Sequence, residues 1–208
     1  MKKLEDGKQE DRFQRAVTVF KDHGGMLRTA EAIRAGVHPD TLYTMRDEGA
    51  LEMISRGVYR IADNPPLGNP DLVTVAMRIP NGVVCLISAL AFHDITTQIP
   101  HEVHIALTRG AKEPRLYYPP LRTYRFADRA LNEGVEEYRI DGVNVRVYSP
   151  EKTLADCFKF RNKIGLDTAI EALRLYRERR SINVNDIMHF SSVCRVANVM
   201  RPYLEAIL

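Results

Sequence analysis

Apolar residues in the first fifty positions recur at helical spacing and predict three short helices. Phe13, Ala16, Val17 and Phe20 stand at i, i+3, i+4 and i+7, which is one face of an amphipathic helix over about residues 10–22. After Gly24-Gly25 and a short apolar link, a second helix is expected over residues 30–35, with Thr29 as its N-cap. A third is expected over residues 39–48, because Pro39 suits a first helical position and Gly49 ends the run.

Two alternating runs, LEMI (51–54) and VYRIA (58–62), follow this third helix directly. Ser55-Arg56-Gly57 separates them, and Gly57 suits the positive φ that a tight turn requires. Two helices joined at a glycine and followed by a hairpin are typical of a winged helix-turn-helix. In that fold the second helix of the pair enters the major groove, and the hairpin, or wing, contacts the DNA backbone.

The remaining chain alternates between strand and helix patterns without a repeat. Turn formers crowd residues 63–70, which we interpret as a domain boundary. Strands are expected over residues 103–107, 122–126, 135–140 and 143–148, with an Asp141-Gly142 hairpin, and helices over residues 70–79 and from Pro150 onward. The run VVCLI (83–87) fits a strand or a helix equally. We therefore predict an α+β protein: a winged helix-turn-helix over residues 1–62, a linker over 63–69, and a mixed sheet-plus-helices domain over 70–208.

The composition indicates an ordinary globular protein but does not indicate a particular activity. Hydrophobic residues make up 45% and charged residues 27% of the 208 positions, as in ordinary globular proteins. No apolar run approaches the roughly 20 residues of a membrane span, and no signal peptide is recognisable, so a cytoplasmic protein is expected. The three cysteines lie far apart and predict buried, reduced thiols.

The net charge of +3 is small, but the basic residues are clustered. Residues 109–125 hold five basic residues and one acidic residue, and residues 159–180 hold seven and three. The first stretch, RGAKEPRLYYPPLRTYR, also carries Tyr117, Tyr118 and Tyr124. Its composition fits nucleic-acid binding through charge and stacking, and fits equally well a loop and strand whose tyrosines half-pack.

The third helix and the wing carry the candidate DNA contacts. With Leu42 and Met45 facing the core, the opposite face presents Thr41, Tyr43 and Thr44, with Arg46 on its flank. Arg56 and Arg60 of the hairpin are candidate phosphate contacts. Asp40 and Asp47 on the same helix repel phosphate, which keeps open a winged helix used for protein contacts.

Catalytic and metal motifs are weak in this sequence. His101 and His104 stand three apart on a predicted strand and therefore face opposite sides of a sheet. Lys152 and Asp156 stand at i, i+4, which predicts a solvated ion pair, although Glu151, Lys152 and Asp156 could also serve a nuclease or phosphotransferase. No phosphate-binding loop is present, and we expect neither an enzyme nor a cofactor or bound metal.

Three segments together resemble the AbiEi family, the antitoxins of type IV abortive-infection toxin–antitoxin pairs. They are residues 24–63, from GGMLRTAEAIRAGVHPD to RGVYRIAD; residues 82–107, GVVCLISALAFHDITTQIPHEVHIAL; and residues 141–176, DGVNVRVYSPEKTLADCFKF to ALRLY. The resemblance implies a phage-defence antitoxin that binds inverted repeats in its own promoter and represses its operon. It also implies a nucleotidyltransferase-like toxin as functional partner, countered without a stable complex.

Carried over to this chain, the resemblance marks two groups of residues. The DNA-binding positions are Arg28, Thr41, Tyr43, Thr44, Arg46, Arg56 and Arg60. The antitoxin-domain motif comprises Ser149, Pro150, Glu151, Lys152, Asp156 and Lys159. The alternative is a stand-alone winged-helix regulator whose C-terminal domain senses a ligand or dimerises.

Overall fold

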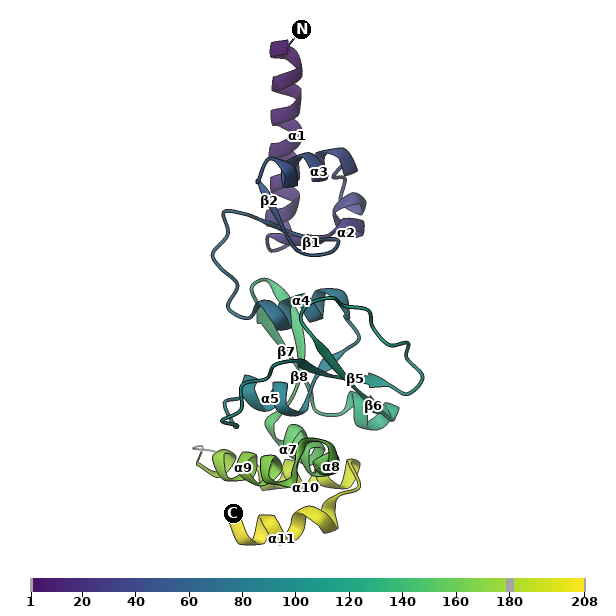
Figure 1. Ribbon diagram of the computed structural model, residues 1–208, viewed down its shortest axis with the longest axis vertical. Coiled ribbons are helices and arrows are strands. Elements are labelled where there is room, and N and C mark those ends of the chain that lie inside the picture. The colour runs from purple at the N-terminus through teal and green to yellow at the C-terminus, as the bar shows by residue number, and fades with distance from the viewer. Residues whose placement is uncertain (1, 179–181, 208) are drawn as a thin grey trace. The chain divides into compact units, whose positions relative to one another are not determined.

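A computed structural model describes residues 2–178 and 182–207, and the chain divides into two compact units. Unit 1 comprises Met1–Met77 and Arg139–Asn144, and unit 2 comprises Arg78–Tyr138 and Val145–Leu208. Both units combine helices with a β-sheet (Figure 1). The predicted α+β class, a winged helix-turn-helix followed by a mixed sheet with helices, is confirmed.

Unit 1 contains the expected helices and hairpin together with one strand that the sequence did not reveal. Its elements are α1 (Lys2–Asp22), β1 (Met26–Arg28), α2 (Thr29–Arg34), α3 (Pro39–Asp47), β2 (Leu51–Ser55), β3 (Val58–Ile61) and most of α4 (Pro70–Arg78). The strands form an antiparallel sheet in the order β1-β3-β2, with Leu27 opposite Tyr59. The predicted apolar link over residues 26–28 is therefore wrong: this three-residue segment is too short to show a strand period, but it pairs with Val58–Arg60 of β3.

The first three helices of unit 1 pack on one apolar core. Phe20 of α1, Leu42 and Met45 of α3, and Leu51 of β2 are buried in the same cluster. Gly36 turns the chain between α2 and α3 at φ 95°, a conformation that favours glycine. One side of α3 is thus fixed by packing, and its other side is left for solvent.

A second, smaller cluster in unit 1 joins segments far apart in sequence. Met26, Val58, Val73 and Met77 are buried there, with Ile140 and Val143 of the distant hairpin packed against them. Gly142 adopts φ 80°, and a Cβ at this position would lie 2.8 Å from the Gly24 carbonyl oxygen. The predicted Asp141-Gly142 turn is present, and its glycine is required by both conformation and close approach.

Unit 2 is built on a five-stranded mixed sheet in the order β6-β5-β4-β8-β7. The strands are β4 (Val83–Val84), β5 (Val103–Thr108), β6 (Leu121–Phe126), β7 (Val135–Ile140) and β8 (Val143–Tyr148). The helices are α5 (Leu86–Phe92), α6 (Asp128–Asn132), α7 (Pro150–Lys159), α8 (Arg161–Ile164), α9 (Leu166–Arg177), α10 (Val184–Val193) and α11 (Ala197–Ile207). The undecided run over residues 83–87 is both elements: β4 ends at Val84 and α5 starts at Leu86.

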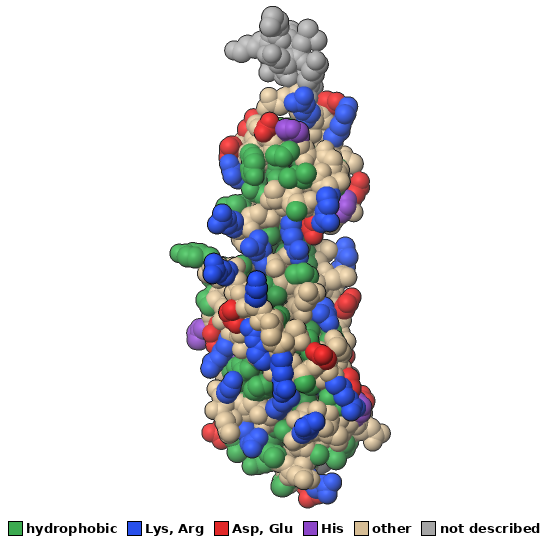
Figure 2. All heavy atoms as spheres, turned by 90° about the vertical axis from the view of Figure 1, so that its right-hand side faces the viewer, with side chains coloured by type: hydrophobic (Ala, Val, Ile, Leu, Met, Phe, Trp, Pro, Cys, Tyr) green, Lys and Arg blue, Asp and Glu red, His purple; other side chains and the backbone are tan. Residues whose placement is uncertain are grey.

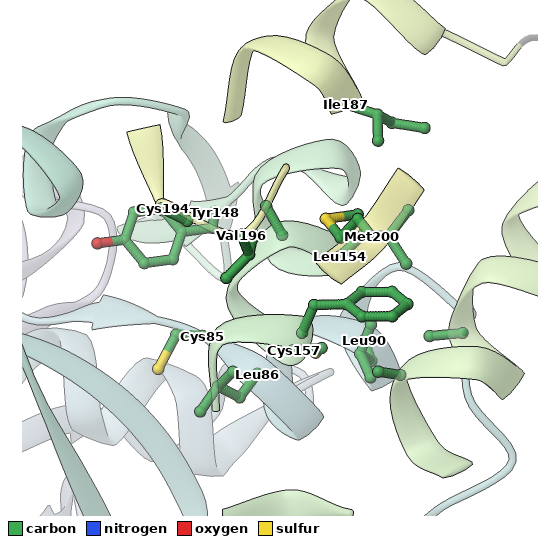
Figure 3. Close-up of a cluster of buried hydrophobic side chains, with 14 of the residues drawn as sticks. Cys85, Leu86, Leu90, Tyr148, Leu154, Cys157, Ile187, Cys194, Val196 and Met200 are labelled. Atoms are coloured by element: carbon green, nitrogen blue, oxygen red, sulfur yellow. The ribbon is translucent and has the colours of Figure 1, made fainter. Parts of the chain in front are cut away.

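Helix α7 lies at the centre of unit 2. It is contacted by α5, α9 and α10, and every residue from Lys152 to Phe158 is buried. Figure 3 shows Leu154 and Cys157 of this helix among side chains from α5, β8, α10 and α11. The polar side chains of Lys152, Thr153 and Asp156 therefore lie away from solvent, whereas Glu151 and Lys159 near the helix ends are half-buried.

Candidate nucleic-acid interface

Helix α3 begins at a well-defined cap. His38 Nδ1 accepts a 3.2 Å hydrogen bond from the Asp40 backbone N–H, and Pro39 takes the first helical position. Pro39 sacrifices no hydrogen bond there, because the first N–H groups of a helix have no partner within it. The cap and the proline therefore fix where the exposed face of α3 starts.

Tyr43 and Arg46 lie together on the outer face of α3, which also carries the exposed Asp40 and Asp47. The Tyr43 residue is 42% exposed, and the guanidinium carbon of Arg46 lies 5.4 Å from its ring centroid. Arg46 also makes a 2.6 Å ion pair with Asp47, and this hydrogen bond raises the pKa of Arg46. Thr44 is half-buried, and its hydroxyl donates to the Asp40 carbonyl oxygen at 2.7 Å. A tyrosine and a cation thus stand together one helical turn apart, with Asp47 reducing the local positive charge.

Thr41 does not lie on that exposed face. It is only 8% exposed, on the side of α3 that turns toward α1. The expectation that Thr41 faces outward is corrected here, because the apolar stripe of α3 is wide enough to take in Thr41 beside Leu42 and Met45.

The wing, residues 51–61, presents Arg56 at its tip. Ser55-Arg56-Gly57 forms the turn between β2 and β3, with Gly57 at φ 74°, and Arg56 is exposed. Met53 on β2 is 52% exposed, beside Tyr59 across the hairpin. The wing therefore offers one cation and one apolar side chain to solvent.

Arg60 is an internal residue of unit 1, which differs from the expectation that it extends from the wing. It is 5% exposed and ion-paired with Glu52 at 2.9 Å. Its guanidinium donates to the carbonyl oxygens of Asn64 and Pro65, the latter at 2.8 Å. Arg60 satisfies the backbone of the segment leaving the wing, and a phosphate has no access to it.

Arg28 is intermediate between these cases. Its side chain is 31% exposed and lies 3.8 Å from Glu31, whose carboxylate accepts from the Arg28 backbone N–H at 3.0 Å. Arg28, rather than the predicted Thr29, is the N-cap residue of α2. Its charge is directed at the first turn of its own helix.

A hollow of about 410 Å³ in unit 1 brings together cations that the sequence analysis did not single out. Arg12 and Arg15 of α1 line it together with His38 from the start of α3. Arg15 is ion-paired with Asp11 at 2.6 Å. The i, i+3 spacing of the two arginines, on the side of α1 that carries Ala16 and Val19, is the signal that could have placed them beside α3.

The antitoxin-domain motif lies in the interior of unit 2. Lys152 Nζ and Asp156 Oδ2 are 2.5 Å apart with both side chains fully buried, so the predicted solvated ion pair is wrong. Cys194 Sγ donates to the other Asp156 oxygen at 3.1 Å, and the Lys152 Nζ lies 4.0 Å from the Tyr148 ring centroid. Burial raises the pKa of Asp156, with Lys152 acting in the opposite direction.

The other motif residues support the same helix. Ser149 is the N-cap of α7, its Oγ accepting from the Lys152 backbone N–H at 3.2 Å, and Pro150 follows at the first helical position. Glu151 accepts a 2.6 Å hydrogen bond from the Tyr176 hydroxyl. Lys159 Nζ lies 5.2 Å from the Phe126 ring centroid. The motif therefore builds a core helix, and its charged pair is closed to any substrate.

The two histidines considered for a metal site have different environments. His101 is exposed, whereas His104 is 3% exposed on β5, with Nε2 3.4 Å from Glu102. Burial lowers the pKa of His104. Across residues 2–178 and 182–207, no group of three or more His, Cys, Asp or Glu side chains is arranged to hold a metal ion. None of the described helices is long and apolar enough to cross a membrane.

Comparison with known proteins identifies the N-terminal segment. Residues 14–62 match the family model described as "Transcriptional regulator, AbiEi antitoxin", which confirms the predicted resemblance over the first of its three segments. The crystal structure of RV2827C protein from Mycobacterium tuberculosis is similar with a TM-score of 0.52 at 13% identity, covering 94% of this chain and 81% of that one. At this identity the likeness concerns the fold alone. No curated protein gives a match.

Proposed function

We propose, because residues 14–62 belong to the AbiEi antitoxin family of transcriptional regulators, that this protein represses its own operon by binding inverted repeats in the promoter. In this proposal α3 enters the major groove and the wing lies along the backbone or the minor groove. The repressor acts where operator DNA is found, in the cytoplasm.

The observation that carries the proposal is the division of α3 into a fixed and a free side. Leu42 and Met45 are fully buried, while Tyr43 next to them is 42% exposed and stacked with Arg46. Because its buried side is packed against the core of unit 1, α3 can present side chains to base edges without first having to be ordered. The exposed turn at Arg56 supplies the flanking phosphate contact that sets register.

The proposed contact set is smaller than the family resemblance implies. Tyr43, Thr44, Arg46 and Arg56 remain as direct contacts, with Arg28 at the edge of the surface. Thr41 and Arg60 act through the fold, because both are less than a tenth exposed. Arg12, on the hollow beside α3, is an additional candidate phosphate contact.

The test is fluorescence anisotropy of the full chain on the DNA upstream of its own gene, against scrambled DNA, over a salt series. We expect sequence-selective binding with a steep salt dependence. Arg56→Ala should weaken binding to all sequences by a similar factor and reduce the salt slope by about one. Lys21→Ala, an exposed cation at the end of α1, is the matched control and should leave both unchanged. Equal affinity for both DNAs would overturn the repressor assignment.

We further propose that residues 70–208 supply the antitoxin activity against a nucleotidyltransferase-like toxin, without a stable complex, and that residues 63–69 link them to the DNA-binding residues 1–62. This proposed functional boundary differs from the boundary between the compact units, because unit 1 also includes residues 70–77 and 139–144. Co-expression of the full chain with the toxin from the neighbouring gene should restore growth. Arg56→Ala should rescue as well as the wild type while losing repression. Failure of the wild type to rescue would leave a stand-alone regulator.

A further inference from the structure

The tyrosine loop, residues 109–120 between β5 and β6 of unit 2, exposes two adjacent aromatic side chains. Tyr117 is 102% exposed and Tyr118 is 62% exposed, whereas Tyr124 on β6 is 2% exposed. The sequence left open whether the tyrosines of residues 109–125 pack against the protein or bind nucleic acid. Of the three tyrosines, only Tyr124 is packed. Two neighbouring tyrosines exposed to water would bury apolar ring surface by stacking on a flat ligand, which favours binding.

The base of this loop is fixed to the sheet. Glu113 accepts hydrogen bonds from the Thr123 hydroxyl at 2.7 Å and from Arg125 Nη2 at 2.6 Å. The backbone N–H of Val103 donates to the Pro120 carbonyl oxygen at 2.8 Å, and Pro119 is buried. The two tyrosines therefore project from an anchored loop, which lowers the ordering entropy that a ligand must overcome.

The charge around the tyrosines is positive. Within the described part of the chain, no carboxylate lies within ion-pair distance of Arg109, Lys112 or Arg115. The loop's one acidic residue, Glu113, is already paired with Arg125. The loop and β6 lie on the right of Figure 1, the side that Figure 2 turns toward the viewer, and Lys and Arg side chains are numerous on that side.

Further cations lie along β6, the strand that the loop leads into. Lys163 Nζ is 5.8 Å from the Tyr124 ring centroid, and Lys159 Nζ is 5.2 Å from that of Phe126. These two lysines extend the positive surface from the loop onto α7 and α8. The surface thus joins unpaired cations to solvent-exposed ring faces.

We propose that the tyrosine loop binds single-stranded nucleic acid, with Tyr117 and Tyr118 stacking on unpaired bases and Lys112 and Arg115 contacting the phosphates between them. This combination of exposed rings and cations matches the alternation of base and phosphate along a single strand. A duplex hides its base faces in the stack, so it would leave both rings unused. An acidic protein segment would satisfy the cations but lacks the regular alternation of flat base and charged phosphate.

The site goes beyond the proposed function, because it lies in unit 2 and uses none of the residues of α3 or the wing. The test is anisotropy of the full chain on fluorescein-labelled twelve-nucleotide dT and rU oligomers, with a hairpin duplex for comparison. We expect both single strands to bind more tightly than the hairpin. Tyr117→Ala with Tyr118→Ala should lower single-strand affinity by about thirtyfold or more, since both stacked bases lose their contacts.

Three control variants separate stacking, charge and general surface effects. Tyr117→Phe with Tyr118→Phe keeps the rings and should bind within about twofold of wild type, because stacking needs no hydroxyl. Ile99→Ala removes another side chain of unit 2, 81% exposed, and should change nothing. Lys112→Ser with Arg115→Ser should flatten the salt dependence, whereas Arg174→Ser, an exposed cation on α9, should not.

The outcomes distinguish this site from the promoter site. Loss of single-strand binding in the double alanine variant, with promoter binding retained, supports the proposal. Single-strand binding that is absent, or that survives the double alanine substitution, overturns it. Loss of toxin rescue in this variant without any single-strand binding would assign the loop to a protein contact and also overturn it. Absence of promoter binding by the wild type would affect only the repressor proposal.

Discussion

Helix α3 of unit 1 and helix α7 of unit 2 start in the same way: a polar side chain caps each, and a proline follows. His38 accepts from the Asp40 N–H and Ser149 from the Lys152 N–H. Each helix then carries a Lys or Arg beside an Asp. In α3 the pair is Arg46–Asp47, with side chains 38% and 65% exposed, and in α7 it is Lys152–Asp156 with both side chains fully buried.

The difference lies in what surrounds the helices. Elements pack on one side of α3 only, whereas α5, α9 and α10 enclose α7. A charged pair in water contributes little to stability, while a charge left alone in a protein interior is costly. The same local sequence pattern thus gives a helix with a solvent-exposed face in one unit and a buried central helix in the other.

Removal of one partner of the buried pair should have the largest effect. Asp156→Ala leaves Lys152 unpaired and takes the acceptor from Cys194, so it should lower the free energy of unfolding of unit 2 by about 3–5 kcal/mol. Urea titration measures this. Lys152→Met with Asp156→Leu should recover most of the loss, because no charge remains buried.

The counterpart in unit 1 is Asp47→Ala, which should leave the unfolding midpoint unchanged within error, since its pair with Arg46 lies in water. The same variant should strengthen DNA binding by removing a negative charge from α3. A loss of stability in Asp47→Ala comparable to that in Asp156→Ala would contradict the comparison.

Within unit 1, substitutions of the two wing arginines should have different effects, because Arg60 is buried and Arg56 is exposed. Arg60→Ala removes the ion pair with Glu52 and two donors to backbone carbonyls, so it should destabilise unit 1 by about 2 kcal/mol. Arg56→Ala, at an exposed turn, should cost less stability than Arg60→Ala while weakening DNA binding. Circular dichroism measures the stability of both variants, and anisotropy measures their DNA binding. A larger stability loss for Arg56→Ala than for Arg60→Ala would contradict the comparison.

The caps should differ by a smaller amount. Ser149→Ala should cost unit 2 about 1 kcal/mol, because the freed Lys152 N–H sits in a buried first turn. His38→Ala should cost less, since water reaches the exposed Asp40 N–H and replaces the lost acceptor. Guanidinium unfolding of the two variants gives the comparison, and a larger loss for His38→Ala would contradict it.

The smallest expected effect is the pH dependence from His104 on β5. Burial lowers its pKa in the folded state, so the unfolded chain binds a proton first as the pH falls. This contribution to stability is complete above the unfolded pKa of about 6.5 and is lost as the pH drops from there toward the folded pKa. The slope for this one proton is at most about 1.4 kcal/mol per pH unit. His104→Gln should remove it between pH 7 and 5, and urea unfolding at a series of pH values measures the slope.

Much of the fold could be predicted from local signals. The Asp141-Gly142 turn, the caps at Ser149-Pro150, and the helix over Pro39–Asp47 each depend on residues adjacent in sequence, and each is present. Strand β1 could not be predicted, because its three residues are strand only through their pairing with β3. Local patterns show where an element starts, but not which distant segment completes it.

The same limit applies to the candidate site. Tyr43 and Arg46 could be placed outward from the period of α3, whereas Thr41 and Arg60 are buried by neighbours outside their own elements. Arg60 is enclosed by Glu52 and by the carbonyl oxygens of residues 64 and 65. The i, i+4 spacing of Lys152 and Asp156 predicts that they pair, but it carries no information on burial. The prediction of a surface pair therefore fails, since both side chains are fully buried.

The three cysteines of the chain, Cys85, Cys157 and Cys194, are all buried in unit 2. Burial raises the pKa of each thiol, so the folded protein holds them protonated and unreactive at neutral pH. An alkylating reagent can then label the chain only when unit 2 opens. The rate at which the native cysteines are labelled thus reports the opening of unit 2. Unit 1 has no cysteine, so it can unfold without any labelling.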